Sequence, residues 1–204
     1  MVQTAIVLID LLPFLLFALT WLGIAAFLRL KKKQSFVSLL FFAIFSIYLY
    51  KVLDYTLFQF QSLLLLKYFM PDLMLNGQAE SMNLIPLATL TSADVKTSLL
   101  NIVLMIPFGF GLPFVASFRM KKAAMIGALF SVGIELLQFV TGLMAKTTFR
   151  IADVNDVIFN TLGVVIGYIL FIGFMHICRR LFSNQTIAAN SIVRYIAERP
   201  QVDR

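Results

Sequence analysis

Five stretches of about twenty mostly apolar residues constrain the fold of this chain more than any other feature. A helix needs about 20 such residues to cross a bilayer, and the backbone amides of a segment in lipid must be satisfied within it. We therefore expect an all-α membrane bundle of five transmembrane helices. The expected spans are roughly Ala5–Leu28, Phe36–Leu57, Thr97–Phe118, Ala123–Gly142 and Asp156–Cys178.

The composition supports this class. The chain has 204 residues, of which 60% are hydrophobic and 13% charged, whereas soluble domains have about 25% charged residues. We expect a single membrane domain over residues 1–204. Its only cysteine is Cys178 and its only histidine is His176, which excludes an intramolecular disulfide, a cysteine-based metal site and a histidine cluster.

The charges are sorted by loop, so the net charge of +7 does not indicate nucleic-acid binding. Most basic residues fall in the first loop, the third loop and the tail at residues 179–204. The positive-inside rule then predicts an outer amino terminus, an inner carboxyl terminus and a cytoplasmic tail. The first apolar stretch lacks the positive start and cleavage site of a signal peptide, so we expect it to stay as a span.

Three apolar pieces outside the spans also carry expectations. The stretch "SLLLLKYFM" in the second loop is too short to span and too apolar for water, so we expect a re-entrant or interfacial outer segment. The stretch "NLIPLATL" is expected to fold back onto the outer surface of the bundle. The tail stretch "TIAANSIVRYIAE" has apolar residues at helical spacing, which is typical of a helix on the inner leaflet.

The start of the fifth span is unusually polar. Asp153, Asp156, Asn160, Gly163 and Gly167 follow in steps of three and four, so a helix would bring them to one face. That face carries polar residues at its outer end and small residues, the two glycines, further into the membrane. The G-x-x-x-G spacing lets another helix approach closely, so we expect the carboxylates to face protein rather than lipid.

The fourth span shows the same pattern, with Ser131, Glu135, Gln138 and Gly142 on one face. We expect Glu135 to lie about 10 Å below the outer boundary. A carboxylate at that depth costs roughly 2–3 kcal/mol on insertion scales, so it needs a partner or a proton. Candidate partners are Arg150 and the amides of Asn101 and Asn160.

Topology brings the polar residues of several segments to one side of the membrane. We predict an outer polar pocket there, without a bound metal or cofactor and open to membrane lipids. Its expected binding residues are Asn83, Asn101, Glu135, Gln138, Arg150, Asp153, Asp156 and Asn160. Glu135 and Asp156 are also the candidate catalytic residues.

Several of these features have a purely structural interpretation. Asp153 could be only a helix cap paired with Arg150, and Asn101 and Gln138 could only join helices. The glycine pair is typical of packing rather than chemistry, and it also permits a homo-oligomer. Glu135 fits such an interpretation least, because an ionisable side chain inside a span indicates a functional site.

Four spaced motifs resemble the signature of VanZ-like membrane proteins. They are "NLIPLATL", "NIVLMIPFGFGLP", "SVGIELLQFVTG" and "RIADVNDVIFNTLGVVIGY", in order over about residues 83–170. Leu87 departs from the pattern, since an aromatic residue often follows the proline. The resemblance implies a bacterial multi-pass cell-membrane protein of the envelope, in a family whose named member is associated with resistance to the glycopeptide teicoplanin.

Three function classes follow from these observations. The first is an envelope factor that binds a lipid-linked cell-wall precursor or a lipoglycopeptide in the outer pocket and contributes to teicoplanin-type resistance. The second is an intramembrane enzyme on a lipid-linked substrate, with Glu135 as acid or base and Asp153 and Asp156 holding Mg²⁺ or Ca²⁺ or orienting the substrate. The third, a transporter or channel, is disfavoured because no inverted repeat is evident. We favour the first.

Overall fold

The computed structural model describes residues 2–58, 82–87, 92–145, 152–182 and 190–199. Five long helices account for most of this part of the chain, and a short helix, α8 (Ser191–Ala197), follows them. The long helices are α1 (Val2–Leu30), α2 (Phe36–Leu53), α4 (Ser92–Val115), α5 (Met120–Ala145) and α6 (Val154–Leu181). All five are long and apolar enough to cross a membrane, which confirms the predicted all-α bundle of five spans.

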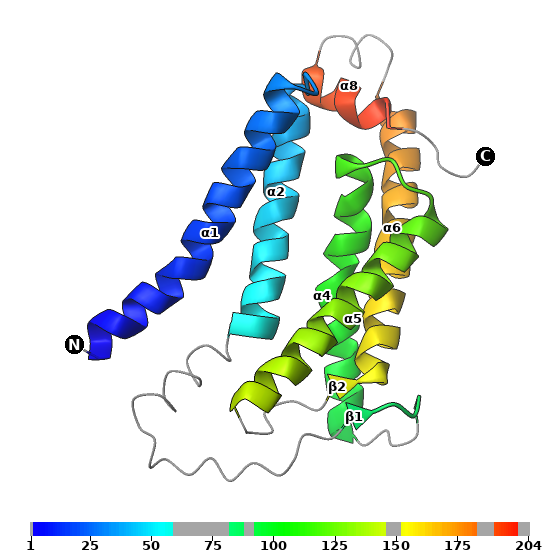
Figure 1. The fold of residues 1–204 in the computed structure, drawn as a ribbon. Coiled ribbons are helices and arrows are strands. Elements are labelled where there is room, and N and C mark those ends of the chain that lie inside the picture. Colours follow the sequence, from blue (N-terminus) through cyan, green and yellow to red (C-terminus); the bar gives the residue numbers. More distant parts are fainter. Residues whose placement is uncertain (1, 59–81, 88–91, 146–151, 183–189, 200–204) are drawn as a thin grey trace.

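The helices alternate in direction, and α4 and α6 run the same way with α5 returning between them (Figure 1). A single π-helical turn, η1 (Asp54–Phe58), extends α2 to the end of the bundle where α6 begins. There Lys51 and Asp54 form an ion pair, with Nζ and Oδ2 3.1 Å apart. The described residues do not test which end lies outside the cell, so the orientation stays a prediction.

The tightest packing in the bundle joins α4 to α6 backbone to backbone. A Cβ atom added at Gly109 of α4 would overlap the carbonyl oxygen of Val164. A Cβ atom at Gly163 or Gly167 of α6 would overlap the carbonyl oxygen of Ile102 or Ile106 in the same way. The glycine spacing is therefore a packing device, as predicted, and it holds the polar ends of α4 and α6 in register.

Apolar side chains fill the remaining space between α2, α4, α5 and α6. Met105 and Val164 are fully buried at the centre, and the ring of Phe45 reaches them from α2. Tyr168 is also fully buried, and its hydroxyl donates to the carbonyl oxygen of Phe118 at 2.8 Å, which satisfies its one polar atom. This core fixes α4, α5 and α6 as one unit.

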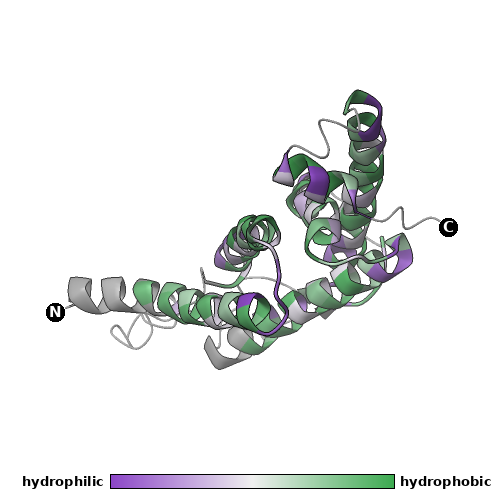
Figure 2. Cartoon of the chain, turned by 90° about the horizontal axis from the view of Figure 1, so that it is seen from above, coloured by the Kyte–Doolittle hydropathy of each residue, from purple (hydrophilic) through white to green (hydrophobic). Residues whose placement is uncertain are grey.

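Helix α1 stands apart from that unit and leans away along α2 (Figures 1 and 2). Its contacts with α2 are aromatic, and the rings of Phe17 and Tyr50 lie 4.9 Å apart between centroids. Most of the other apolar side chains that are described over residues 11–30 of α1 are exposed, including Leu19 at 66%. The apolar colouring runs along the lengths of the helices and the polar colouring gathers near their ends (Figure 2), as expected of segments that lie in lipid.

The segment before α4 folds back onto the bundle, as predicted. Strand β1 (Met82–Asn83) pairs in parallel with strand β2 (Ala152–Asp153), so that Asn83 lies opposite Asp153. Leu87 has a positive φ of 58° at the end of this segment. The predicted re-entrant stretch "SLLLLKYFM" lies outside the described residues.

Candidate functional site

Hydrogen bonds join polar residues of η1, β1, α4, α5, β2 and α6 towards the end of the bundle where α6 begins, and Figure 1 shows β1 and β2 at that end. We call this group the polar cluster. Most members are buried, although they sit on helices that are otherwise apolar. The cluster consists of Thr56, Asn83, Asn101, Ser131, Glu135, Gln138, Asp153, Asn155, Asp156 and Asn160.

Asp153 begins α6 as its N-cap. It has an extended backbone (φ −120°, ψ 122°), and its side chain accepts a hydrogen bond from the backbone N–H of Asn155 at 2.8 Å. The amide nitrogen of Asn83 donates to the same Oδ1 atom at 3.1 Å. The predicted helix cap is confirmed, whereas its predicted partner Arg150 lies outside the described residues. Asp153 precedes the helix by one residue, so the helical face predicted for it contains Asp156 and Asn160 without Asp153.

Asn155 joins the segment before α4 to α6. It is 5% exposed, and its Oδ1 atom accepts from the backbone N–H of Leu87 at 2.8 Å. The sequence analysis missed this residue because it lies off the face defined by Asp156 and Asn160. The signal was present, since an amide in the first turn of an apolar helix often bonds to neighbouring backbone.

Glu135 projects from α5 into the cluster and is 8% exposed. The backbone N–H of Asp153 donates to its Oε2 atom at 3.1 Å. The residue lies ten positions before the end of α5 at Ala145, which is about 15 Å along the helix axis. A carboxyl group in this setting is fixed in orientation by the strand that leads into α6.

Asn101 and Asp156 connect α4 to α6 within the cluster. The amide nitrogen of Asn101 donates to Oδ1 of Asp156 at 2.6 Å. Asn101 is 7% exposed and lies nine residues after the start of α4 at Ser92, which is about two and a half helical turns. Asp156 also lies in the first turn of α6, where the helix dipole favours a negative charge.

Gln138 and Asn160 have buried side-chain amides, and in each of them the nitrogen forms a hydrogen bond whereas the oxygen does not. The nitrogen of Gln138 donates to the backbone oxygen of Thr56 at 2.9 Å, and the nitrogen of Asn160 donates to Oγ of Ser131 at 2.7 Å. Within the described residues, neither Oε1 of Gln138 nor Oδ1 of Asn160 has a hydrogen-bond partner. Two buried acceptors in one cluster favour a ligand that supplies N–H or O–H groups.

Seven of the eight predicted binding residues therefore meet in one cluster. Arg150 lies outside the described residues. The amides of Asn101 and Asn160, expected beside Glu135, donate to Asp156 and Ser131. Thr56 was not predicted, because its contribution is a backbone oxygen made available at a π-helical turn.

The cluster offers carboxylate and amide oxygens as acceptors at the edge of an apolar bundle. Among the described residues, no group of three or more histidine, cysteine, aspartate or glutamate side chains is placed to hold a metal ion. The groups of the cluster can form hydrogen bonds to a polar head group, and Glu135 or Asp156 can transfer a proton.

The sequence of the chain matches one protein-family model. The VanZ/LLP1 model matches residues 52–178, which run from the end of α2 to the end of α6 and include the whole polar cluster. The chain belongs to the VanZ/LLP1 family. No curated protein and no solved structure matches it. The VanZ/LLP1 region thus coincides with the α4–α6 unit, whereas α1, most of α2 and α8 lie outside it.

Proposed function

We propose that this VanZ/LLP1 protein binds the polar head of an envelope amphiphile in the polar cluster. The ligand would be a lipid-linked cell-wall precursor or a lipoglycopeptide, and binding would contribute to teicoplanin-type resistance in a bacterial cell membrane. One observation carries the proposal. The oxygens of Gln138 and Asn160 are buried without a hydrogen-bond partner among the described residues, and each of these amides lies about one helical turn from a carboxylate, Glu135 on α5 and Asp156 on α6.

The chemistry of these acceptors suggests the kind of head group. Amide oxygens accept hydrogen bonds, and ionised carboxylates only accept. A head group rich in hydroxyl, amide N–H or ammonium groups satisfies such a set, whereas an anionic phosphate does not. Sugars and peptides of cell-wall precursors and of glycopeptides supply these donors.

The surroundings suit the apolar part of such a ligand. The helices that carry the cluster expose apolar side chains next to it, for example Leu137 at 53% and Leu99 at 57%. A lipid tail can therefore stay in the bilayer while its head reaches the polar cluster. The positive-inside prediction places this end at the outer leaflet, where lipid-linked precursors and antibiotic meet.

The first test is teicoplanin susceptibility. A sensitive strain would express wild type, Gln138→Leu, Asn160→Leu and Glu135→Gln, with Val140→Leu on α5 as an exposed control. Immunoblots would check that membrane levels are equal. We expect protection from wild type and the control, and its loss in the three cluster variants. No protection by wild type would overturn the resistance role.

The second test measures binding directly. Fluorescent teicoplanin would be titrated onto the purified full chain in nanodiscs, with wild type and the same variants. We expect saturable binding that weakens at least tenfold in Gln138→Leu and Asn160→Leu. Binding that is equal in all variants would refute the cluster as the site.

One combination of results favours the alternative, an intramembrane enzyme acting on a lipid-linked substrate with Glu135 as acid or base. The backbone N–H of Asp153 orients the Glu135 carboxyl group, as a catalytic group requires. Glu135→Gln would then keep binding yet lose protection. Loss of both together supports the binding role.

A further inference from the structure

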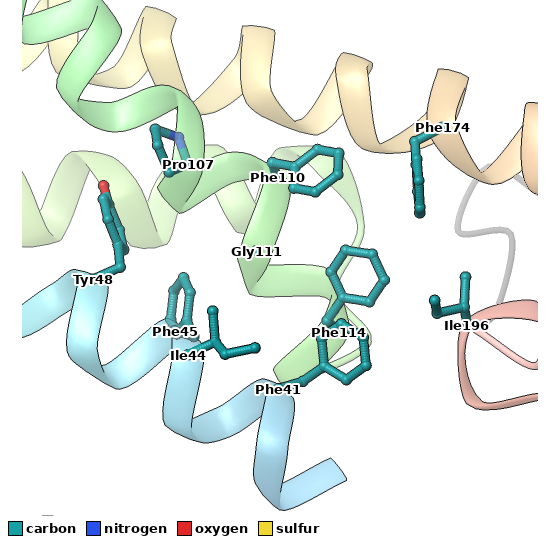
Figure 3. A pocket seen from close by; sticks show the side chains of 10 residues that line it. All are labelled: Phe41, Ile44, Phe45, Tyr48, Pro107, Phe110, Gly111, Phe114, Phe174 and Ile196. Carbon is teal, nitrogen blue, oxygen red and sulfur yellow. The ribbon is translucent and has the colours of Figure 1, made fainter. Parts of the chain in front are cut away.

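An apolar pocket lies next to α8, towards the end of the bundle opposite the polar cluster. Its volume is about 330 Å³ and it is formed by α2, α4, α6 and α8 (Figure 3). We propose that it binds an acyl chain of an anionic phospholipid whose head group meets the basic residues around α8. This site is separate from the polar cluster and does not depend on the proposed function.

The walls of the pocket are apolar and aromatic. Phe41, Ile44 and Phe45 enter from α2, Phe114 from α4, Phe174 from α6 and Ile196 from α8 (Figure 3). The rings of Phe41 and Phe114 stack with centroids 4.9 Å apart, which keeps the wall rigid. A volume near 330 Å³ falls at the lower end of the 300–1,000 Å³ typical of ligand sites.

The pocket is open to the outside of the bundle. Ile44 lines it and is nevertheless 57% exposed. It lies in the middle of α2, a helix with the length and hydropathy of a span. In a membrane, the middle of a spanning helix lies at the level of the lipid acyl chains. The opening of the pocket therefore faces acyl chains, and a hydrocarbon chain can enter it.

Helix α8 covers the pocket at the end of the bundle. The hydroxyl of Tyr195 donates to the carbonyl oxygen of Phe114 at 2.6 Å and lies 3.2 Å from Oγ of Ser38. The Tyr195 ring stacks on Phe41 with centroids 5.1 Å apart. Ile196, the next residue, therefore stays against the pocket, and the chain from α8 onward meets the head-group level.

The charged residues near the pocket determine which lipid head group is favoured there. Within the described residues, Glu198 is the one acidic side chain at this end. Arg199 lies with its guanidinium carbon 4.1 Å from the centroid of Tyr195, beside the covered pocket. Among the described residues, the ends of α1, α4 and α6, the start of α5 and the loops that join α1 to α2 and α4 to α5 lie at the same end as α8 (Figure 1) and add Arg29, Lys31, Lys32, Lys33, Arg119, Lys121, Lys122, Arg179 and Arg180 to Arg194 and Arg199. Arg194 lies on α8 and Arg199 lies two residues after its end, so these two side chains are the ones that would meet the head group of a lipid in the pocket, and they favour an anionic head group over a cationic one.

The experiment is native mass spectrometry of the full chain released from detergent, with phosphatidylglycerol or phosphatidylcholine of identical acyl chains added. Ile44→Trp would fill the pocket from its open side. Ile47→Trp is the matched control, because Ile47 is 61% exposed on the same helix and does not line the pocket. We expect one retained phosphatidylglycerol per chain in wild type and Ile47→Trp, and at least fivefold less in Ile44→Trp.

Two double variants test whether basic residues near α8 select the lipid head group. Arg194→Gln combined with Arg199→Gln should abolish the preference for phosphatidylglycerol over phosphatidylcholine. Lys121→Gln combined with Lys122→Gln removes the same charge at the same end and also removes a cation from an aromatic ring, since Nζ of Lys122 lies 4.6 Å from the Phe118 centroid. That control should keep the preference.

A photolabelling experiment needs no variant and covers the case in which Ile44→Trp does not fold. Phosphatidylglycerol with a diazirine in its acyl chain would be crosslinked to wild-type chain in nanodiscs and mapped by peptide sequencing. Labels concentrated on residues 41–48 and 107–114 are expected. Equal retention of both lipids by wild type, equal loss in both tryptophan variants, or labels spread evenly over α1 and α5 would each overturn the proposal.

Discussion

The amide nitrogen of Asn101 on α4 lies 2.6 Å from Oδ1 of Asp156 on α6. This contact joins two helices that run in the same direction and are not consecutive in the chain. It also lies at the polar end of the seam that Gly109, Gly163 and Gly167 make possible. The glycines bring the backbones together, and the polar pair fixes the register at their end.

Replacing Asn101 by alanine should destabilise the bundle. The change leaves the partly buried carboxylate of Asp156 without one of its donors, which costs about 1–3 kcal/mol. Thermal unfolding in detergent should show a midpoint lower by several degrees. Val103→Ala on the same helix is the control, because Val103 is 62% exposed and should change the midpoint little. An equal shift in both variants would contradict a specific role for the pair.

The α4–α6 seam predicts opposite outcomes for two glycines on one helix. Gly167→Ala puts a methyl group into the carbonyl oxygen of Ile106, so α4 and α6 must separate. Gly173→Ala meets no atom within 4 Å. We expect the first variant to unfold at a clearly lower temperature or to fail to accumulate. The second should match wild type or gain slightly, because alanine favours helix by about 0.5–1 kcal/mol. Similar behaviour of the two would argue against close packing.

The spans and the seam were predictable because their signals are local and repeated. About twenty apolar residues in a row define a span, and Gly163 and Gly167 are spaced by one helical turn. The polar end was predictable for the same reason, since Glu135 with Gln138 and Asp156 with Asn160 follow helical spacing. The sequence therefore indicated which faces of α5 and α6 turn toward protein, but not that α4 is the helix that packs against the glycines of α6.

Other features depend on contacts that no local pattern encodes. Asn83 faces Asp153 through a strand pairing of two residues each, across 70 positions of the chain. The Thr56 carbonyl reaches Gln138 only because α2 ends in a π-helical turn. The apolar pocket beside α8 was not predicted at all, because its walls read as ordinary lipid-facing residues along the sequence.

The bond between Asn155 and Leu87 can be tested by hydrogen exchange. Asn155→Ala removes the acceptor of the Leu87 N–H, so that amide should lose its protection. Mass spectrometry of peptides that cover residues 82–87 would measure the change. Thr161→Val is a suitable control on α6, because its hydroxyl donates only locally to the oxygen of Val157. Unchanged exchange at Leu87 in Asn155→Ala would mean that another contact holds the segment.

Ser131 and Asn160 allow a test of whether the cluster is built for stability or for binding. Both are buried, at 0% and 5% exposure, and the amide nitrogen of Asn160 donates to Oγ of Ser131. Ser131→Ala alone removes the acceptor of a buried N–H, at a cost of about 1–3 kcal/mol. The double variant Ser131→Ala with Asn160→Leu replaces both partners by apolar groups, which can be nearly neutral. We therefore expect the double variant to unfold closer to wild type than the single one, and yet to bind labelled teicoplanin at least tenfold more weakly. A double variant that is stable and binds normally would show that Asn160 serves the packing of α5 on α6 and no ligand.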